Sequence, residues 1–282
     1  MANILVFGPG FLGTKFHLST EGSILSHADI ADHVQICTAL DEHHPDVVIN
    51  FAGKTGKPNV DWCETNPLPT MRSNVVGALV LAEACAERGI HLTHIASGCV
   101  FYGPSPDPNG WREDDFANPS AFYSRTKYAA DLVLSQLPNV AVVRLRMPID
   151  SEPSPRNLID KLAQYPKIVD VENSVTVVDD LLQAVKGIIE KRGIGIFHAV
   201  NPGVMWHRDL IALYEELVDP RHTNEWITEA DLVAQGLVAR KRSNNIMQNT
   251  RLPALDIHLR PINVALRDTM EKYALACRAI IH

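Results

Sequence analysis

The sequence predicts an α/β protein: a Rossmann-type, doubly wound parallel sheet with a smaller, mostly helical C-terminal lobe. Short, continuous apolar runs alternate with amphipathic stretches through about the first 200 residues, as in parallel sheets covered by helices. A glycine-rich turn joins the first run to the first helix. Beyond residues 201–203 the alternation fades, and helices are expected at 208–218, 228–235 and 262–280. We therefore divide the chain into a core, residues 1–150, and a mixed segment, residues 151–282, that returns strands to the core and forms the lobe.

Composition excludes several classes of protein. A net charge of -7 without any long Lys/Arg block argues against nucleic-acid and anionic-membrane surfaces. No apolar run approaches the roughly 20 residues of a membrane span. Five cysteines without CxxC pairing, and a chain that enters a strand at once, predict a reducing, cytoplasmic setting. No metal site is expected, because His91 and His94 point to opposite faces of a strand.

The first expected strand, residues 3–7, leads directly into a GxGxxG motif and a helix. Gly8 permits a tight turn, Gly10 lets the backbone approach a pyrophosphate, and Gly13 lets the helix pack on the strand. Phe11 and Leu12 open the helix whose N-terminus would hold the phosphates. Strand before and helix after are the context in which this motif predicts dinucleotide binding.

The second strand, residues 23–25, ends in Ser26 and His27 rather than in the acidic residue that accepts the ribose 2′-hydroxyl of NAD. This favours NADPH as the cofactor, with NADH as the alternative. Asp29 and Ile30 lie just beyond and are candidates for the adenine edge. The alternative is that Asp29 only caps the helix running toward residue 43.

The third strand, residues 47–51, delivers Ala52 and Gly53 and then a loop, residues 53–64, to the carboxyl edge of the sheet, where open α/β folds bind ligands. Lys54 and Lys57 in this loop are candidates for diphosphate contacts, the cofactor's for Lys54 and the substrate's for Lys57. Solvated loop lysines are the alternative. A helix with a purely structural face is expected from 71 to 88.

The fourth strand, residues 91–96, places Ser97 and Cys99 at its carboxyl end. A long loop, residues 102–118, follows and is expected to be functional. Ser120 is expected to cap a helix through 137 that carries Tyr123 and Lys127 one turn apart.

The remaining elements continue the pattern. A fifth strand is expected at 140–146, then a Pro-rich loop, residues 150–156, and a short helix containing Asn157 and Lys161. An extended piece at 175–178, a helix at 179–192 and a sixth strand at 195–199 follow.

The order of these signals resembles the extended short-chain dehydrogenase/reductases. The glycine turn follows the first strand, Ser97 follows the fourth, and Tyr123-x-x-x-Lys127 opens the fifth helix. Within that family the resemblance is strongest to the dTDP-4-dehydrorhamnose reductase branch, and in particular to the plant-type bifunctional 3,5-epimerase/4-reductases that make UDP-L-rhamnose.

Several segments carry this last resemblance, and one departs from it. The glycine turn reads GxGxxG, whereas that group usually shows GxxGxxG, so the phosphate contacts differ in detail. The matching segments span the chain from the third strand into the lobe: GKTGKPNVDWCE at 53–64, SGCVF at 97–101, FYSRTK at 122–127, RLRMPI at 144–149, PRN at 155–157, NPGV at 201–204 and RSNN at 242–245.

The resemblance implies a ketone reductase site. A free tyrosine titrates near 10, so Tyr123 needs a nearby positive charge to exchange protons near neutrality. Lys127 supplies that charge and also holds the nicotinamide ribose. Ser97 donates a hydrogen bond to the substrate carbonyl, and the cofactor supplies the hydride.

The resemblance also implies epimerisation at C3 and C5 of the sugar, which needs an acid and a base on opposite faces of the ring. Cys99 and Lys161 are the candidates, with their individual roles open. The alternative for Cys99 is a small buried hydrophobe, and for Lys161 a solvated helix residue.

The expected partner is a nucleotide sugar, linked to UDP or dTDP, and a homodimer is left open. The resemblance makes Arg156, Arg242 and Lys57 candidates for its diphosphate, with surface ion pairs as the alternative for the arginines. The asparagines Asn157, Asn244 and Asn245 are candidates for sugar or nucleotide groups. Two alternative functions remain, a reductase without epimerase activity and a non-catalytic, NADP-binding regulatory subunit.

Overall fold

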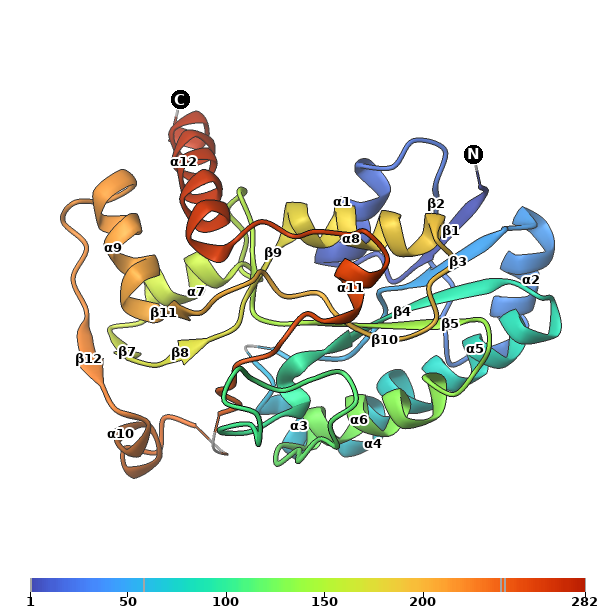
Figure 1. The fold of residues 1–282 in the computed structure, drawn as a ribbon, viewed down its shortest axis with the longest axis horizontal. Helices are drawn as coiled ribbons and strands as arrows, with labels where there is room; N and C mark the ends of the chain where they lie inside the picture. Colours follow the sequence, from blue (N-terminus) through green and yellow to red (C-terminus); the bar gives the residue numbers. More distant parts are fainter. Residues whose placement is uncertain (1, 58, 239, 241, 282) are drawn as a thin grey trace.

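A computed structural model describes residues 2–57, 59–238, 240 and 242–281. Its centre is a six-stranded parallel sheet in the order β10-β5-β4-β3-β1-β2 (Figure 1). The predicted α/β fold with a parallel sheet is therefore confirmed, and all six expected strands are present. Their bounds are β1 Ile4–Phe7, β2 Ile24–Ser26, β3 Val47–Asn50, β4 His91–Ser97, β5 Val140–Leu145 and β10 Gly195–His198.

Helices cover both faces of the sheet because alternate strand residues point to opposite faces. Leu5 of β1 and Val48 of β3 face the helices α2 (His33–His43), α5 (Gly77–Glu87) and α6 (Phe122–Leu134). Val6 and Ile49 face α1 (Phe11–Leu18) and α8 (Val178–Glu190) on the other side. The two groups of helices lie on opposite sides of the strands in Figure 1. Both faces are thus buried, as the uninterrupted apolar runs predict.

Two predicted helix starts are wrong. Ala121, not Ser120, is the residue before α6, and its first N–H, that of Phe122, donates to Glu64 Oε1 at 2.7 Å. A carboxylate from the short helix α3 (Trp62–Thr65), which forms at the end of the expected loop after β3, replaces the expected serine cap. At α2 the capping residue is Asp32, whose side chain accepts from the N–H groups of Val34 and Gln35. The alternative role of Asp29 as this cap is therefore also wrong.

The expected helix at 71–88 is interrupted. The chain forms α4 (Pro67–Met71), a π-helical segment (Arg72–Val76) and then α5. In this π-helical segment the Asn74 side chain reaches the loop after β3. Its amide oxygen accepts from Lys54 N at 2.6 Å, and its amide nitrogen donates to Lys54 O at 3.0 Å. Such π segments frequently occur at functional sites, and this one fixes the backbone of the loop that begins at Gly53.

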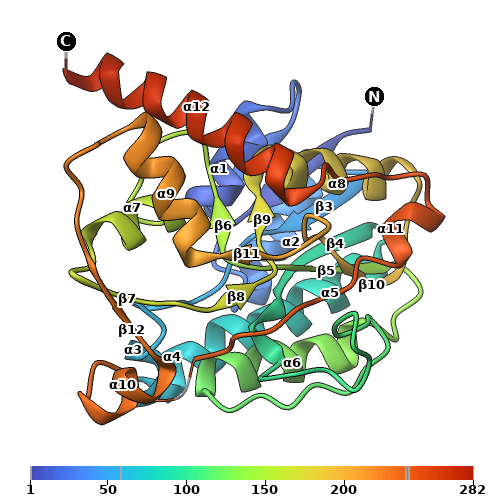
Figure 2. The same cartoon turned by 60° about the vertical axis from the view of Figure 1, so that its left-hand side comes forward.

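The C-terminal lobe combines the expected helices with three short strand pairs, of which the sequence analysis predicts only β9, as the extended piece at 175–178. Its core lies between α9, α12 and α7 (Figure 2). The pairs are β6 with β9, β7 with β12, and β8 with β11. The helices are α7 Leu158–Gln164, α9 His207–Leu217, α10 Glu229–Ala234 and α12 Ile262–Ile281, and the strands are β6 Pro148–Ile149, β7 Lys167–Val169, β8 Glu172–Asn173, β9 Thr176–Val177, β11 Met205–Trp206 and β12 Glu225–Ile227.

The chain crosses back from the lobe to the core along residues 243–254. Trp111, in the long loop after β4, donates its backbone N–H to Ile246 O at 2.8 Å, and its ring stacks on Phe101 at 4.7 Å. The short helix α11 (Arg251–Ala254) then packs against β10. This crossing segment brings residues 243–245 over the carboxyl end of β4.

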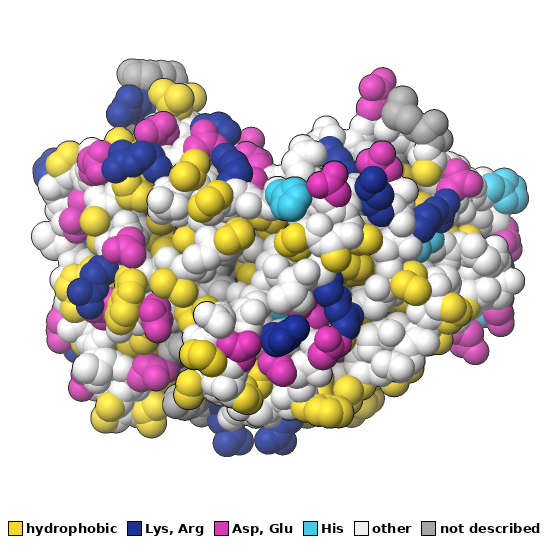
Figure 3. All heavy atoms as spheres, in the orientation of Figure 1, with side chains coloured by type: hydrophobic (Ala, Val, Ile, Leu, Met, Phe, Trp, Pro, Cys, Tyr) yellow, Lys and Arg dark blue, Asp and Glu magenta, His cyan; other side chains and the backbone are white. Residues whose placement is uncertain are grey.

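The surface is mixed in charge. Acidic and basic side chains are interspersed on the face drawn in Figure 3. Among the described residues, no helix combines the length and apolarity needed to cross a bilayer. That part of the chain also holds no cluster of three His, Cys, Asp or Glu side chains suited to a metal ion.

Candidate active site

The glycine turn forms a tight junction between β1, α1 and the chain after β3. Gly8 has φ +91°, and a Cβ there would lie 2.3 Å from Ala52 N. A Cβ on Gly13 would lie 2.1 Å from Gly8 O, so both positions require glycine. Gly10 is exposed, and a Cβ there would meet nothing within 4 Å. The open side of the turn at Gly10, before an α1 N-terminus that has no side-chain cap, fits a dinucleotide phosphate.

A shallow pocket of about 360 Å³ lies beyond the end of β2. Ser26 and His27 line it, whereas Asp29 is exposed and accepts from Ala31 N at 2.9 Å. Ile30 is buried against Gly77 at the start of α5. At the predicted adenosine end of the cofactor site, the structure thus places the two β2-end residues in the pocket and Asp29 on the surface.

Three of the predicted basic side chains lie on the loop after β3. Residue 58 of this loop is outside the described residues. Lys54 lies over the Trp62 ring, with Nζ 5.6 Å from the centroid. Arg156 donates to Thr55 Oγ1 at 2.9 Å, and Arg242 makes a two-pronged ion pair with Asp61 at 2.9 Å. Lys57, in the same loop, is exposed. The structure therefore brings Arg156, two residues before α7, and Arg242, which directly precedes the crossing segment, to the loop that carries Lys54 and Lys57.

Ser97, Cys99 and Tyr123 meet at the carboxyl end of β4. A short 3₁₀ turn, Gly98–Val100, follows the strand, and Ser97 Oγ accepts from Cys99 N at 3.2 Å. Burial raises the pKa of the Tyr123 phenol above its usual value, Cys99 adds to this rise, and the Ser97 hydroxyl opposes it. The phenol is therefore a proton donor near neutral pH unless a positive charge approaches it.

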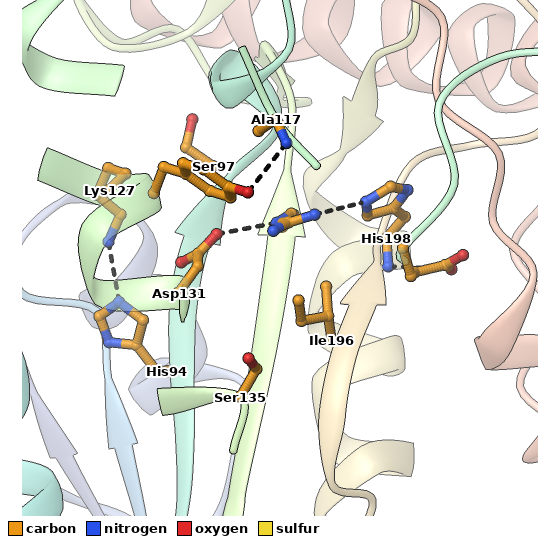
Figure 4. A network of polar contacts seen from close by, with 12 residues as sticks. His94, Ser97, Ala117, Lys127, Asp131, Ser135, Ile196 and His198 are labelled. Carbon is orange, nitrogen blue, oxygen red and sulfur yellow. Dashed lines mark hydrogen bonds and ion pairs between the residues drawn. The ribbon is translucent and has the colours of Figure 1, made fainter. Parts of the chain in front are cut away.

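Lys127 lies one turn beyond Tyr123 on α6 but its amine points toward the sheet. Nζ lies 3.0 Å from His94 Nε2 and 3.0 Å from Ile95 O (Figure 4). Burial lowers the pKa of Lys127 to about 8, and the Asp131 carboxylate opposes this shift. The sequence analysis did not predict the contact with His94, although a histidine in a buried strand is an unusual residue that needs a hydrogen-bond partner.

Cys99 and Lys161 come from different parts of the molecule. Cys99 lies in the turn after β4 and Lys161 lies on α7, and both are half-buried. Burial lowers the pKa of Lys161 and the Arg156 charge lowers it further, whereas Cys99 opposes both.

Arg146 is a site residue that the sequence analysis missed. Its guanidinium donates to Cys99 Sγ at 3.4 Å and to Ser243 Oγ at 3.2 Å, and it also contacts the Ser243 carbonyl and Asn173 Oδ1. The side chain is 1% exposed. An arginine directly after an apolar strand is the signal that was available, because such a charge is rarely buried without a specific partner.

The three asparagines that were predicted to bind substrate all make hydrogen bonds within the protein. Asn157 caps α7, and its amide is fully used by backbone groups of Asp150, Glu152 and Ile159. Asn244 contacts Glu229 and Asn173.

Asn245 is buried over the turn that carries Cys99. Its Nδ2 atom donates to Phe101 O at 2.8 Å and to Gly98 O at 3.2 Å. Asn245 therefore positions the Cys99 turn, rather than pointing into open space.

These features define a class. A glycine turn at a parallel strand, a serine after the fourth strand and a Tyr-x-x-x-Lys pair on one helix are the pattern of the short-chain dehydrogenase/reductases. The family model described as the RmlD substrate binding domain matches residues 3–275, and the chain belongs to this family.

Known proteins of this family are similar over nearly the whole chain. The bifunctional dTDP-4-dehydrorhamnose 3,5-epimerase/dTDP-4-dehydrorhamnose reductase of Arabidopsis thaliana is 35% identical over 261 residues, covering 89% of this chain and 86% of that protein. The crystal structure of the L780 UDP-rhamnose synthase of Acanthamoeba polyphaga mimivirus has a TM-score of 0.89 and 28% identity, covering 96% of this chain and 99% of that one.

The fold also matches a dTDP-4-dehydrorhamnose reductase of Bacillus anthracis in complex with NADP. Its TM-score is 0.83 at 19% identity, with 97% of this chain and 98% of that chain covered. The family and the fold predicted from the sequence are thus confirmed.

Proposed function

We propose that this protein is an NADPH-dependent 3,5-epimerase/4-reductase that converts a nucleoside-diphosphate 4-keto-6-deoxyglucose to the NDP-L-rhamnose. The observation that carries the proposal is the joint presence of two acid/base sets in one site. Ser97, Tyr123 and Lys127 suit reduction of the ketone, and Cys99 and Lys161 suit proton exchange beside it. The similarity to the Arabidopsis bifunctional enzyme supports the same conclusion.

The reduction at C4 uses the residues at the end of β4 and the start of α6. Bound NADPH supplies the hydride. The Ser97 hydroxyl donates a hydrogen bond to the carbonyl oxygen and stabilises the negative charge that develops there. Tyr123 delivers the proton, and Lys127, when charged, lowers the pKa of its phenol. The Ser97 hydroxyl already acts on the Tyr123 phenol, whose rise in pKa it opposes, and we propose that both groups bind the same oxygen of the substrate.

Epimerisation uses the second pair. Removing the protons at C3 and C5 leaves an enolate, which the same Ser97 and Tyr123 groups stabilise at O4. In the gluco-configured chair these two hydrogens are axial on one face, so one base on that face and one acid on the other suffice for both carbons. Cys99, in the turn after β4, and Lys161, on α7, are the proposed acid and base and divide these roles between them.

The cofactor lies across the glycine turn in this proposal. Gly8, Gly10 and Gly13 would hold its pyrophosphate at the N-terminus of α1, with Phe11 and Leu12 in the first turn of that helix. Asp29 and Ile30, beyond Ser26, would lie at its adenosine end. Ala52, Gly53, Lys54, Tyr123 and Lys127 would hold its nicotinamide end. The lack of an acidic residue at Ser26 and His27 favours NADPH over NADH.

The sugar nucleotide binds beside the loop after β3. Arg156, Arg242 and Lys57 are the proposed diphosphate ligands, because guanidinium groups hold phosphate oxygens in pairs. Asn244 and Asn245 lie in the crossing segment that borders this region.

All five cysteines are free thiols, which supports a reducing, cytoplasmic location.

The function is tested by following NADPH consumption with UDP- and dTDP-4-keto-6-deoxyglucose, and with the corresponding sugars already epimerised. The proposed enzyme consumes NADPH with the unepimerised sugar. A reductase alone consumes it only with the epimerised sugar. A non-catalytic subunit binds NADPH and turns over neither.

The Cys99→Ser variant separates the two activities. Loss of the thiol should lower hydrogen exchange at C3 and C5 by roughly 10²–10⁴-fold, the usual contribution of a general acid or base. Reduction of the pre-epimerised sugar should continue, because Ser97 and Tyr123 are intact. Exchange at the wild-type rate in this variant would remove Cys99 from the mechanism.

A further inference from the structure

Three buried side chains, Lys127, His94 and Asn50, form a continuous chain of contacts behind the reductase site. Lys127 Nζ lies 3.0 Å from His94 Nε2, and His94 Nδ1 lies 3.1 Å from Asn50 Nδ2. Lys127 is 3% exposed, and the other two side chains are fully buried. Figure 4 shows the Lys127 and His94 side chains in contact beneath the site.

The orientation of Asn50 is fixed by the backbone. Its Oδ1 atom accepts from Ala52 N at 2.9 Å, and a backbone N–H can only donate. The amide nitrogen of Asn50 must therefore face His94, and it too can only donate. It follows that His94 Nδ1 is the acceptor and carries no proton.

The tautomer of His94 then determines the state of Lys127. A neutral imidazole with a bare Nδ1 carries its proton on Nε2, which therefore donates toward Lys127 Nζ. An ammonium group has three donors and no acceptor, so it cannot receive this bond, whereas a neutral amine can. The amine keeps two N–H groups, one of which donates to Ile95 O at 3.0 Å. The contacts are satisfied only when Lys127 is uncharged.

The environment of the two side chains also favours a neutral His94 and a neutral Lys127. Burial and the nearness of Lys127 hold the pKa of His94 well below its usual value, so the imidazole is neutral. Burial lowers the pKa of Lys127 to about 8, against the pull of Asp131 on the same helix, so the neutral amine is well populated at pH 8 and dominates above it. Burial also raises the pKa of Tyr123, so the phenol adds no negative charge near neutral pH. Asp131 itself is paired with Arg144 on β5 at 2.9 Å, which reduces its effect on the amine.

We propose that Asn50 and His94 are positioning residues that hold Lys127 as a neutral amine in the cofactor-free protein, and that binding of NADPH converts it to the ammonium by uptake of one proton from solvent. The inference rests on the proposed function, because it assumes that NADPH binds beside Lys127. Cofactor hydroxyls supply the acceptors that an ammonium needs. The charge that activates Tyr123 therefore appears only when the cofactor is present.

Calorimetry of NADPH binding in two buffers of different ionisation enthalpy, HEPES and Tris at pH 8, counts the protons taken up. The 2′-phosphate of NADPH is already fully ionised at this pH. Wild-type protein should take up a substantial fraction of one proton, rising toward one at pH 9. In Lys127→Met the uptake should vanish. Binding without proton uptake in the wild type would overturn the proposal.

The Asn50→Asp variant is the matched control, because it preserves the size of the side chain and the acceptor for Ala52 N. A carboxylate accepts from Nδ1–H, which moves the imidazole proton and leaves Nε2 as an acceptor for an ammonium. Lys127 should then be charged before NADPH arrives, and the proton uptake should fall toward zero. Uptake equal to that of the wild type would contradict the chain of contacts.

A second measurement uses the wild-type protein without NADPH, so it does not depend on whether a variant folds. In ¹⁵N-histidine-labelled, cofactor-free protein, NMR should find His94 with a bare Nδ1 and a protonated Nε2. The opposite tautomer, or an imidazolium, would reject the proposal. Failure of NADPH to bind at all, together with the expected tautomer, would instead count against the proposed function.

Discussion

At the scale of single residues, two buried arginines near the end of β5 illustrate how this protein uses charge. Arg144 lies in the strand and is paired with the Asp131 carboxylate at 2.9 Å, and it also contacts His198. Figure 4 labels these two partners, Asp131 and His198. Arg146, two residues later, is equally buried, and the partners described for it are neutral oxygens and the Cys99 sulfur. The Arg146 guanidinium donates to the Cys99 sulfur at 3.4 Å, so its charge acts directly on the thiol that is proposed to exchange protons.

The Arg146→Met variant should therefore impair proton exchange more than reduction. A hydrogen bond to a charged group contributes about 1.5–3 kcal/mol, so exchange at C3 and C5 should slow by roughly 10–100-fold. Reduction of the pre-epimerised sugar reports on the intact fold and serves as the control. Arg146→Lys, which keeps the charge, should recover part of the exchange. Equal losses in both activities would show that Arg146 only supports the structure.

At the scale of elements, the glycine turn ties β1, α1 and the chain after β3 into one junction. Gly13→Ala places a Cβ against Gly8 O and should destabilise the protein by about 1–3 kcal/mol, as overpacking does. Gly10→Ala meets open space and should change stability by about 1 kcal/mol or less.

Gly10→Ala, which should hardly change stability, should nevertheless weaken NADPH binding. The Gly10→Ala methyl group occupies the side from which a pyrophosphate approaches, so affinity should fall roughly tenfold or more, the effect of about 1.4 kcal/mol. Urea unfolding and NADPH titration of the two variants check both expectations. A stable Gly10→Ala protein with wild-type affinity would show that the phosphates bind elsewhere.

The regular elements were predictable because each has a local signal. Val47–Asn50 is a short apolar run before a glycine, and α8 repeats apolar residues at helical spacing. The π segment at Arg72–Val76 was not, because its pattern differs little from that of an α-helix. The two-residue strands of the lobe are too short to show any period. The cap of α6 comes from Glu64, 58 residues away, which no local rule detects.

The candidate site was predictable in part. Ser97, Tyr123 and Lys127 are named by spacing, and the structure places them around the end of β4, while their catalytic roles stay predictions. The contact of Arg146 with Ser243 spans 97 residues, and that of Lys127 with His94 spans 33. Such contacts depend on the tertiary fold, so the sequence could name the reactive groups but not the side chains that set their charge.

At the scale of the whole molecule, ion pairs and hydrogen bonds join the core to the C-terminal segment at the loop after β3. Asp61 holds Arg242, which lies 181 residues later in the chain, and Thr55 holds Arg156. These contacts keep the proposed diphosphate ligands beside the proposed cofactor site. If these arginines bind the diphosphate as proposed, substrate binding should also affect the packing of the lobe against this loop.

Arg242→Ala should raise the KM for the sugar nucleotide by roughly 10–100-fold, the effect of about 1.5–3 kcal/mol from a charged hydrogen-bond donor. The affinity for NADPH should not change, since Arg242 is anchored on the loop and not at the glycine turn. Steady-state kinetics with a separate NADPH titration test this. A KM equal to that of the wild type would remove Arg242 from the diphosphate site.

The central claim is that one site both epimerises and reduces the sugar. The most direct measurement is to incubate the protein with NADPH and UDP- or dTDP-4-keto-6-deoxyglucose in deuterated water and to analyse the product by NMR. The account predicts NADPH consumption and an L-rhamnose nucleotide carrying deuterium at both C3 and C5. No NADPH consumption with either sugar, or a reduced product without deuterium at these carbons, would contradict it.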